Sequence, residues 1–162
     1  MRWYPLWRRT MVLELLRSYK GLYIETQRYK DIYLRLNDEI GVRGVSYDSQ
    51  PSGSSKMSQT ERDAIKLVEA MTEYLDKFNR ATARMVEIEK MIQRVSDPRG
   101  RYVLHARYVE QKTIDQICND EVIDRGRSQV YRYHDQAIEE LEQIYENGTE
   151  WYIDQDENND KI

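Results

Sequence analysis

The stretch DPRGRYVLHARYVEQKTIDQIC, residues 97–118, followed after a short gap by RGRSQVYRYHDQAIEEL, residues 125–141, decides the fold of the C-terminal part. Pro98 suits the first turn of a helix, where its missing N–H has no intrahelical partner, and Asp97 can cap that helix. Thr113 can cap a second, short helix. The third helix opens with arginines and polar residues and then becomes apolar. The pattern predicts three helices, the last two joined by a turn as in a helix-turn-helix.

The apolar residues of these helices recur at three- or four-residue steps, so each helix has one inner face. We expect the first helix to end near Glu110 and Tyr108 to pack between two helices. The turn lacks the usual glycine, so Asn119 or Asp120 is expected to take its positive φ. His105, His134 and Cys118 are interpreted as packing or hydrogen-bonding groups. The expected inner residues are Tyr102, Val103, Ala106, Ile114, Ile117, Val130, Tyr133 or His134, Ala137, Leu141 and Ile144.

Two long helical segments precede this region. Residues 11–40 carry a 3/4-spaced seam, and Gly, Pro and Ser mark residues 41–57 as a linker. Ser58 and Glu61 form a capping box that opens a helix to about Arg94. Helices this long need a partner along their apolar stripes, so we expect a hairpin that also dimerises. The expected stripe of the second helix is Ala64, Val68, Met71, Leu75, Phe78, Thr82, Met85, Ile88, Ile92 and Val95.

The predicted fold is all-α, with a long helical hairpin or coiled-coil arm followed by a small helix-turn-helix domain. Its expected parts are an aromatic and basic segment (1–10), the arm (11–96, with linker 41–57), the domain (97–147) and an acidic, disordered tail (148–162). Charge is uneven, because residues 1–36 carry eight Lys or Arg and three Asp or Glu, whereas residues 97–147 carry seven and eleven. A local basic surface for a polyanion is therefore compatible with the net charge of −4.

Composition argues against several classes of protein. One cysteine and two histidines are too few for an internal disulfide or a structural zinc site, and they fit a reducing cytosol. No apolar run approaches a membrane span, and Met1–Thr10 has no signal-peptide pattern. We see no phosphate loop, paired carboxylates or nucleophile elbow. We therefore expect neither an enzyme nor a cofactor or metal.

The start of the last helix is the candidate site. In DNA recognition, arginine hydrogen-bonds to O6 and N7 of guanine and glutamine hydrogen-bonds to adenine. A serine at a helix N-terminus can bind a phosphate. An ordinary solvated helix start is the alternative interpretation. Asp120, Glu121 and Asp124 oppose DNA binding unless they point away or pair with the arginines. Four further basic residues have two equal interpretations, either contacts with DNA phosphates or ion pairs with Asp97, Glu110 or Asp115. They are Arg99, Arg101, Arg107 and Lys112. The predicted DNA-binding residues are Arg125, Arg127, Ser128, Gln129, Arg132, Lys112 and Thr113.

Residues 97–141 resemble region four of bacterial sigma factors. The whole layout is similar to the RinA and ArpU-like late-transcription regulators of phages of Gram-positive bacteria, in which a coiled helical half precedes a sigma-like half. The matching positions cover about a quarter of the chain: Arg101, Leu104, Arg107, Tyr108, Thr113, Ile114, Ile117, Val130, Tyr131, Arg132, His134, Ala137 and Leu141. The resemblance implies a sequence-specific, double-stranded-DNA-binding activator of phage late genes in the host cytoplasm.

Two other functions share these features. A phage small terminase subunit also joins a helix-turn-helix to a helical oligomerisation part. An adaptor that binds host RNA polymerase without binding DNA fits the acidic balance of residues 97–147. Oligomeric state separates the first of these from a regulator, because a ring favours packaging and a dimer favours regulation.

Overall fold

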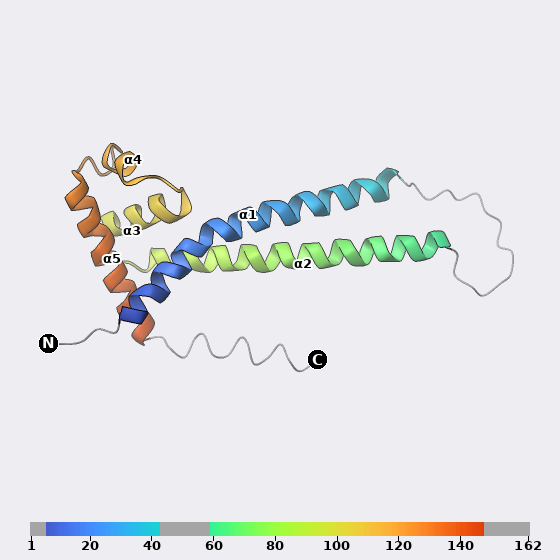
Figure 1. Ribbon diagram of the computed structural model, residues 1–162, viewed down its shortest axis with the longest axis horizontal. Coiled ribbons are helices and arrows are strands. Elements are labelled where there is room, and N and C mark those ends of the chain that lie inside the picture. Colours follow the sequence, from blue (N-terminus) through green and yellow to red (C-terminus); the bar gives the residue numbers. More distant parts are fainter. Residues whose placement is uncertain (1–5, 43–58, 148–162) are drawn as a thin grey trace. The chain divides into compact units, whose positions relative to one another are not determined.

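The computed structural model describes residues 6–42 and 59–147, with side chains for 11–40 and 59–145 (Figure 1). Every regular element in these ranges is a helix, which confirms the all-α class. The expected linker, the Ser58 cap and the acidic tail lie largely or wholly outside the described residues. The elements are α1 (Leu6–Val42), α2 (Gln59–Gln93), α3 (Pro98–Leu104), a π-helical turn η1 (His105–Val109), α4 (Ile114–Cys118) and α5 (Arg127–Asn147).

The helix boundaries differ from the sequence prediction at the N-terminus. α1 begins at Leu6, so half of the segment expected to stand apart from the first helix is already helical. No glycine or proline interrupts residues 6–10, and leucine and arginine are good helix formers. None of the helices within residues 6–42 and 59–147 combines the length and the apolar character needed to cross a bilayer.

The chain divides into two compact units, Gly21–Met85 and Met1–Lys20 with Val86–Ile162. Both divisions fall inside the long helices, whereas the sequence-based boundary lies at residues 96 and 97. The start of α1 belongs with the C-terminal unit because Tyr19 is buried there and its hydroxyl donates a hydrogen bond to Glu89 near the end of α2. We call Gly21–Met85 the arm and residues 97–147 the head.

The arm is an antiparallel helical hairpin, as predicted. The Thr26 hydroxyl lies 3.5 Å from the Met85 sulfur, and the rings of Tyr29 and Tyr74 are 6.3 Å apart. Residues of increasing number along α1 therefore lie beside residues of decreasing number along α2, as in antiparallel helices. Thr26 is buried without an unsatisfied group, because its hydroxyl donates to the Leu22 carbonyl at 2.7 Å.

The inner stripe of α2 differs from the predicted one. Ala64, Val68 and Leu75 were expected inside, but all three are exposed. The sequence of α2 contains two 3/4-spaced stripes offset by one residue, and spacing alone does not tell which of them faces α1. Within the arm, the buried and half-buried stripe of α2 is Leu67, Met71, Tyr74, Phe78, Ala81 and Met85.

The head is built around α5. Asp97 caps α3 by accepting a hydrogen bond from the amide of Arg99, and Pro98 occupies the first turn, as predicted. α3 passes into η1 rather than continuing as an α-helix to Glu110. A Cβ on Gly100 would lie 3.1 Å from the Cβ of Ala137, so α3 and α5 approach closely at this glycine. The core cluster is Val103, Ala106, Ile117, Ile123, Val130 and Tyr133, with Tyr102, Ile114 and Cys118 packed against it.

Tyr108 connects η1 to α5, as expected for a core residue between two helices. Its side chain is buried, and its hydroxyl lies 2.9 Å from Nε2 of His134. Burial raises the pKa of Tyr108, and the charge of Arg17 opposes the shift. The second nitrogen of His134 lies 3.2 Å from a carboxylate oxygen of Asp135. Both groups therefore serve packing and hydrogen bonding in the head.

Candidate nucleic-acid interface

Thr113 starts the helix that precedes the candidate recognition helix. The amide of Gln116 donates to the Thr113 hydroxyl at 3.3 Å, and the Thr113 amide donates to the Gln116 side chain at 2.8 Å. This reciprocal capping box satisfies two amides that α4 leaves without intrahelical partners. The predicted cap is confirmed, and it gives Thr113 a structural task beside its predicted contact with DNA.

The turn between α4 and α5 closes on Asp120. Its carbonyl accepts hydrogen bonds from the amides of Ile123 and Asp124 at 3.0 and 2.8 Å. The expectation that Asn119 or Asp120 adopts a positive φ is wrong, since the residue that does so in this turn is Asp124, with φ 39°. The chain reverses immediately before α5 rather than at the end of α4. Ile123 is buried in this turn, which anchors it to the core.

A second positive φ lies where the chain leaves η1. Gln111 has φ 59°, and its side-chain amide donates to the carbonyl of Tyr108. The left-handed conformation redirects the chain toward Thr113 and α4, at a cost of about 1 kcal/mol for a residue with a Cβ. Sequence reasoning missed this position, because glutamine carries no signal for positive φ.

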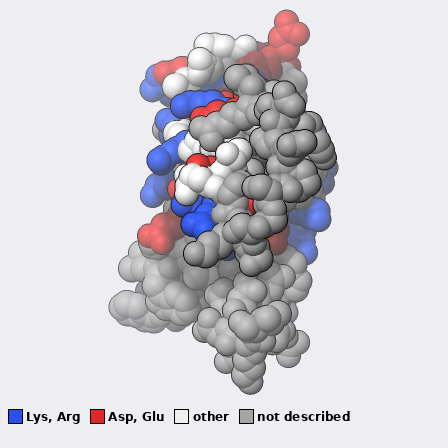
Figure 2. Space-filling view, turned by 90° about the vertical axis from the view of Figure 1, so that its right-hand side faces the viewer, with Lys and Arg blue, Asp and Glu red and all other residues white. Residues whose placement is uncertain are grey.

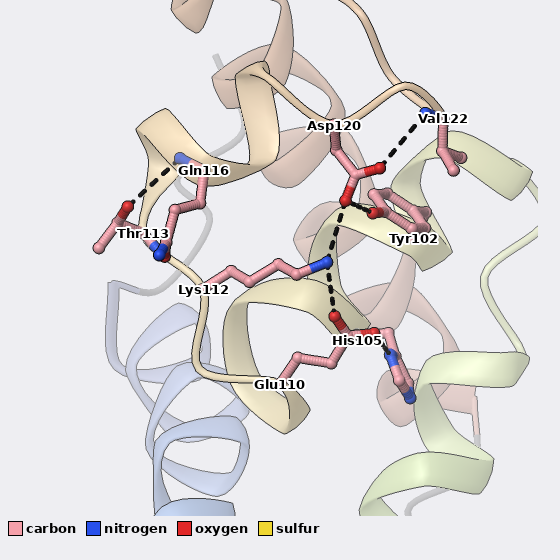
Figure 3. Close-up of polar contacts among 8 residues, drawn as sticks. All are labelled: Tyr102, His105, Glu110, Lys112, Thr113, Gln116, Asp120 and Val122. Carbon is pink, nitrogen blue, oxygen red and sulfur yellow. Dashed lines mark hydrogen bonds and ion pairs between the residues drawn. The ribbon is translucent and has the colours of Figure 1, made fainter.

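Lys112 links the end of η1 to the turn between α4 and α5 (Figure 3). Its ammonium group lies 2.8 Å from Glu110 and 2.9 Å from Asp120. Asp120 also accepts a hydrogen bond from the Tyr102 hydroxyl, and an amide hydrogen bond from Val122 at 3.4 Å. The Tyr102 and Lys112 hydrogen bonds lower the pKa of Asp120 to about 2, while Glu110 and Asp120 raise the pKa of Lys112 above its ordinary value.

Asp120 pairs with Lys112 and not with an arginine of the last helix. Lys112 makes the ion pair with Glu110 that was one of its expected alternatives, and a second one with Asp120, which was not among the expected partners. The two carboxylates stabilise the charged ammonium group, and their contacts with it connect the end of η1 to the turn before α5.

The arginines of α3 and η1 are also occupied within the chain. Arg99 lies over the ring of Tyr133, 5.7 Å from its centroid, and donates to the Tyr133 hydroxyl at 3.3 Å. Arg101 donates to the carbonyl of Val95 at 3.0 Å, and Arg107 to that of Lys112 at 3.1 Å. The alternatives expected for them were phosphates or the carboxylates of Asp97, Glu110 and Asp115, and these contacts are to neither.

The first turns of α5 present a polar outer face. Ser128 and Arg132 are exposed and four residues apart, which places them on the side of the helix opposite Val130 and Tyr133. Gln129 is half-buried beside the inner face, and Arg125 is exposed just before the helix. The structure therefore brings Ser128 and Arg132 together, with Gln129 turned partly inward.

Arg127 lies toward α4. Its guanidinium is 2.5 Å from the carboxylate of Asp115, and the two side chains are 67% and 59% exposed. An ion pair this exposed contributes about 0–1 kcal/mol, so the arginine is free to exchange its partner. Arg127 is therefore not sequestered in the protein interior, although it points to a different side of α5 from Arg132.

Tyr131 is a candidate contact that was not included in the predicted site. It is 51% exposed on the outer part of α5, one residue before Arg132. The signal in the sequence is the helical period, because at about 100° per residue Tyr131 lies about 100° around α5 from Val130 and about 160° from Tyr133, both of which face inward. Val122 in the turn is also exposed.

Charge elsewhere on the molecule is mixed. Figure 2 shows both Lys or Arg and Asp or Glu side chains among the described residues on the face that it views. Residues 58–96 carry seven of each sign. The described residues contain no group of three or more His, Cys, Asp or Glu side chains arranged to hold a metal ion.

Comparison with known proteins gives a family without an assigned activity. No curated protein and no solved structure matches the chain. A family model described as "Protein of unknown function (DUF1492)" matches residues 52–142, which is more than half of the chain and includes α2 and the helix-turn-helix up to most of α5. The chain therefore belongs to the DUF1492 family.

Proposed function

We propose that this protein is a sequence-specific, double-stranded-DNA-binding transcription regulator, an activator of phage late genes that acts as a homodimer in the bacterial host cytoplasm. The observation that carries the proposal is the two-sided character of α5. Ser128 and Arg132 are exposed on its outer face, while Val130, Tyr133 and Ala137 are buried on its inner face. A recognition helix needs this division, because its first turns enter the major groove while the rest packs on the domain.

Each exposed group has a stated task in this proposal. Arg132 donates two hydrogen bonds to guanine O6 and N7, and Ser128 contacts a phosphate or base edge beside it. Arg125 and Arg127 contact phosphates, and Arg127 exchanges its exposed pair with Asp115 for that contact. Gln129, being half-buried, reaches the groove only with its amide end.

Lys112 and Thr113 act as positioning residues in this scheme. Thr113 fixes the first turn of α4, and Lys112 ties the end of η1 to Asp120 in the turn before α5. Together they hold the angle between α4 and α5, and that angle sets how far α5 reaches into a groove. Their substitution should weaken binding to all sequences through the position of α5, without changing which base is preferred.

The test begins with selection of bound duplexes from a random library, followed by fluorescence anisotropy on the selected sequence. Arg132→Ala should weaken binding by about 1–3 kcal/mol, or roughly 5- to 150-fold, and relax the preference at one base pair. Arg80→Ala, on an exposed position of the arm, is the matched control for loss of one positive charge. Failure of the wild-type protein to bind or enrich any duplex at low salt would refute the proposal.

An adaptor that binds host RNA polymerase is the second candidate. Two observations favour a protein partner at the head: Val122 and Tyr131 are 67% and 51% exposed, and acidic residues outnumber basic ones in residues 97–147. Capture of purified polymerase by the wild-type protein, lost in Val122→Asp and retained in Arg132→Ala, would support the adaptor. Binding of DNA without capture of polymerase would reject it.

A further inference from the structure

Five exposed residues of α2, with the half-buried Thr82 at their C-terminal end, form a second stripe along the arm. Ile65, Val68 and Leu75 are 44%, 54% and 40% exposed, although each is large and apolar. Together with three polar residues they step by three and four, the spacing of a helix–helix seam. We call this set the outer stripe: Ile65, Val68, Thr72, Leu75, Asn79 and Thr82.

The outer stripe is continuous with the interface between α1 and α2. Five of its six members directly follow a residue of the inner stripe, as Thr72 follows Met71 and Asn79 follows Phe78. One residue corresponds to about 100° around an α-helix. α2 therefore carries one wide face. It is mainly apolar on the side that α1 covers, and apolar and polar residues are equal in number on the other side. A helix of a bundle has such a face when it contacts two neighbouring helices.

We propose that the outer stripe binds the same stripe of a second copy of this chain, with the two α2 helices parallel and in register. The inference rests on the homodimer included in the proposed function and names its surface. In this register each residue meets its own copy across the two-fold axis. The apolar positions Ile65, Val68 and Leu75 then pair with apolar ones, and Thr72 and Asn79 pair with polar ones.

Antiparallel pairing of the two outer stripes is less favourable in every register in which their central residues face one another. It sets Val68 or Leu75 opposite Thr72 or Asn79, and so buries polar groups against apolar ones. It also brings together Glu69 and Asp76, which follow Val68 and Leu75 on one flank of the stripe. Like charges facing one another destabilise a pair of helices. Parallel pairing keeps Glu69 and Asp76 of one copy away from those of the other, because residues after the seam then face residues before it.

Asn79 is a further reason to expect that the partner of the outer stripe is a helix. A single asparagine at a seam position is tolerated when the same residue of a second helix bonds its amide, and it then fixes register and a two-helix assembly. Parallel pairing also places both C-terminal ends of α2 at one end of the pair. Each end leads into a head, so both heads of the dimer start from the same side.

Light scattering after size exclusion tests the surface without DNA. The wild-type protein should have twice the 19.5 kDa chain mass. Leu75→Asp should weaken dimerisation roughly 30-fold or more, as for a central interface residue. Ile24→Asp, at a 58% exposed apolar position on α1, is the matched control and should leave the dimer intact. Circular dichroism should report equal helix content in both variants.

Cysteine cross-linking tests the register. In a Cys118→Ser background, Asn79→Cys should form a disulfide between copies under mild oxidation, because a parallel pair in register brings the two Cα atoms within the roughly 7 Å that a disulfide needs. Arg80→Cys, one residue away from the stripe, is the control and should not cross-link.

A wild-type protein of single-chain mass, a larger ring, or a dimer broken by Ile24→Asp but not by Leu75→Asp would overturn the inference. A dimer in which Asn79→Cys fails to cross-link would overturn the parallel register. These outcomes are distinguishable from failure of the proposed function. A dimer with no affinity for duplex DNA supports this surface and refutes DNA binding. DNA binding by a single chain supports the DNA-binding part of the proposed function and refutes both its homodimer and this surface.

Discussion

Adding one methyl group at Gly100 tests how tightly α3 packs on α5. The new Cβ would lie 3.1 Å from the Ala137 Cβ, 3.4 Å from a methyl of Val95 and 3.5 Å from the Tyr133 carbonyl oxygen. None of these neighbours is the mobile end of a long side chain, so the helices must separate by a few tenths of an ångström. Overpacking of a buried site typically costs about 1–3 kcal/mol.

Two effects of opposite sign compete in Gly100→Ala. Alanine lowers the conformational entropy of the unfolded chain and favours helix by at most about 1 kcal/mol, and less in a first helical turn. Subtracting this gain from the packing cost predicts a net destabilisation of about 1 kcal/mol. Gly21→Ala is the matched control, because Gly21 is also helical but has no atom within 4 Å of its would-be Cβ. It should stabilise its own region by about 0.8–1 kcal/mol.

Native-state hydrogen exchange measures both effects locally. Amides of α3 and α5 should exchange about fivefold faster in Gly100→Ala, which corresponds to about 1 kcal/mol, and amides around Gly21 should exchange more slowly in Gly21→Ala. Gly100→Leu should increase the loss, because a longer side chain cannot be accommodated by a small shift. If Gly100→Ala protects α3 and α5 as much as Gly21→Ala protects α1, the close approach of the two helices is refuted.

Two further predictions concern the network that positions α5. The pKa of Asp120 is lowered from 3.8 to about 2, so its contribution to stability is complete above pH 3.8 and is lost as the pH falls through 2. The stability difference between wild type and Asp120→Asn, from urea unfolding, should therefore be largest near neutral pH and disappear as the pH falls below 2; a constant difference would contradict the hydrogen bonds from Tyr102 and Lys112 that lower this pKa. Thr113→Ala should destabilise the head by about 1 kcal/mol through loss of the α4 cap, while Thr113→Ser should retain most of that stability. Equal unfolding midpoints for Thr113→Ala and wild type would contradict the capping role.

Much of the head could be predicted because its signals are local. The Asp97 and Thr113 caps, the Pro98 start and the inward face of α5 each depend on neighbouring residues, and all are present in the structure. The turn before α5 could not be predicted in the same way. Asp120 is held by Tyr102 and Lys112, which are 18 and 8 residues away. The positive φ in this turn lies at Asp124.

Only part of the arrangement of the predicted site residues could be predicted, because some of it depends on contacts between residues far apart in the sequence. The exposure of Ser128 and Arg132 follows from the helical period of α5 alone, so it could be predicted. The ion pairs of Lys112 with Glu110 and Asp120 depend on how the chain folds back after η1, which one sequence does not reveal. For Lys112 the sequence therefore leaves a phosphate contact and an ion pair as equal alternatives, and the structure adds that it pairs with Glu110 and Asp120.

The stripes of α2 show a different limit, and it bears on assembly. Periodicity finds every apolar stripe of a helix but does not say which partner covers it. The predicted stripe combined residues of both α2 stripes, because Val68 and Leu75 belong to one and Met71 and Phe78 to the other. A helix with a single neighbour needs only one stripe. The second stripe of α2 lies outside the hairpin interface, so selection for a stable hairpin alone does not explain its apolar residues. A partner helix does, and this makes Leu75→Asp the substitution that most directly separates folding of the arm from its assembly.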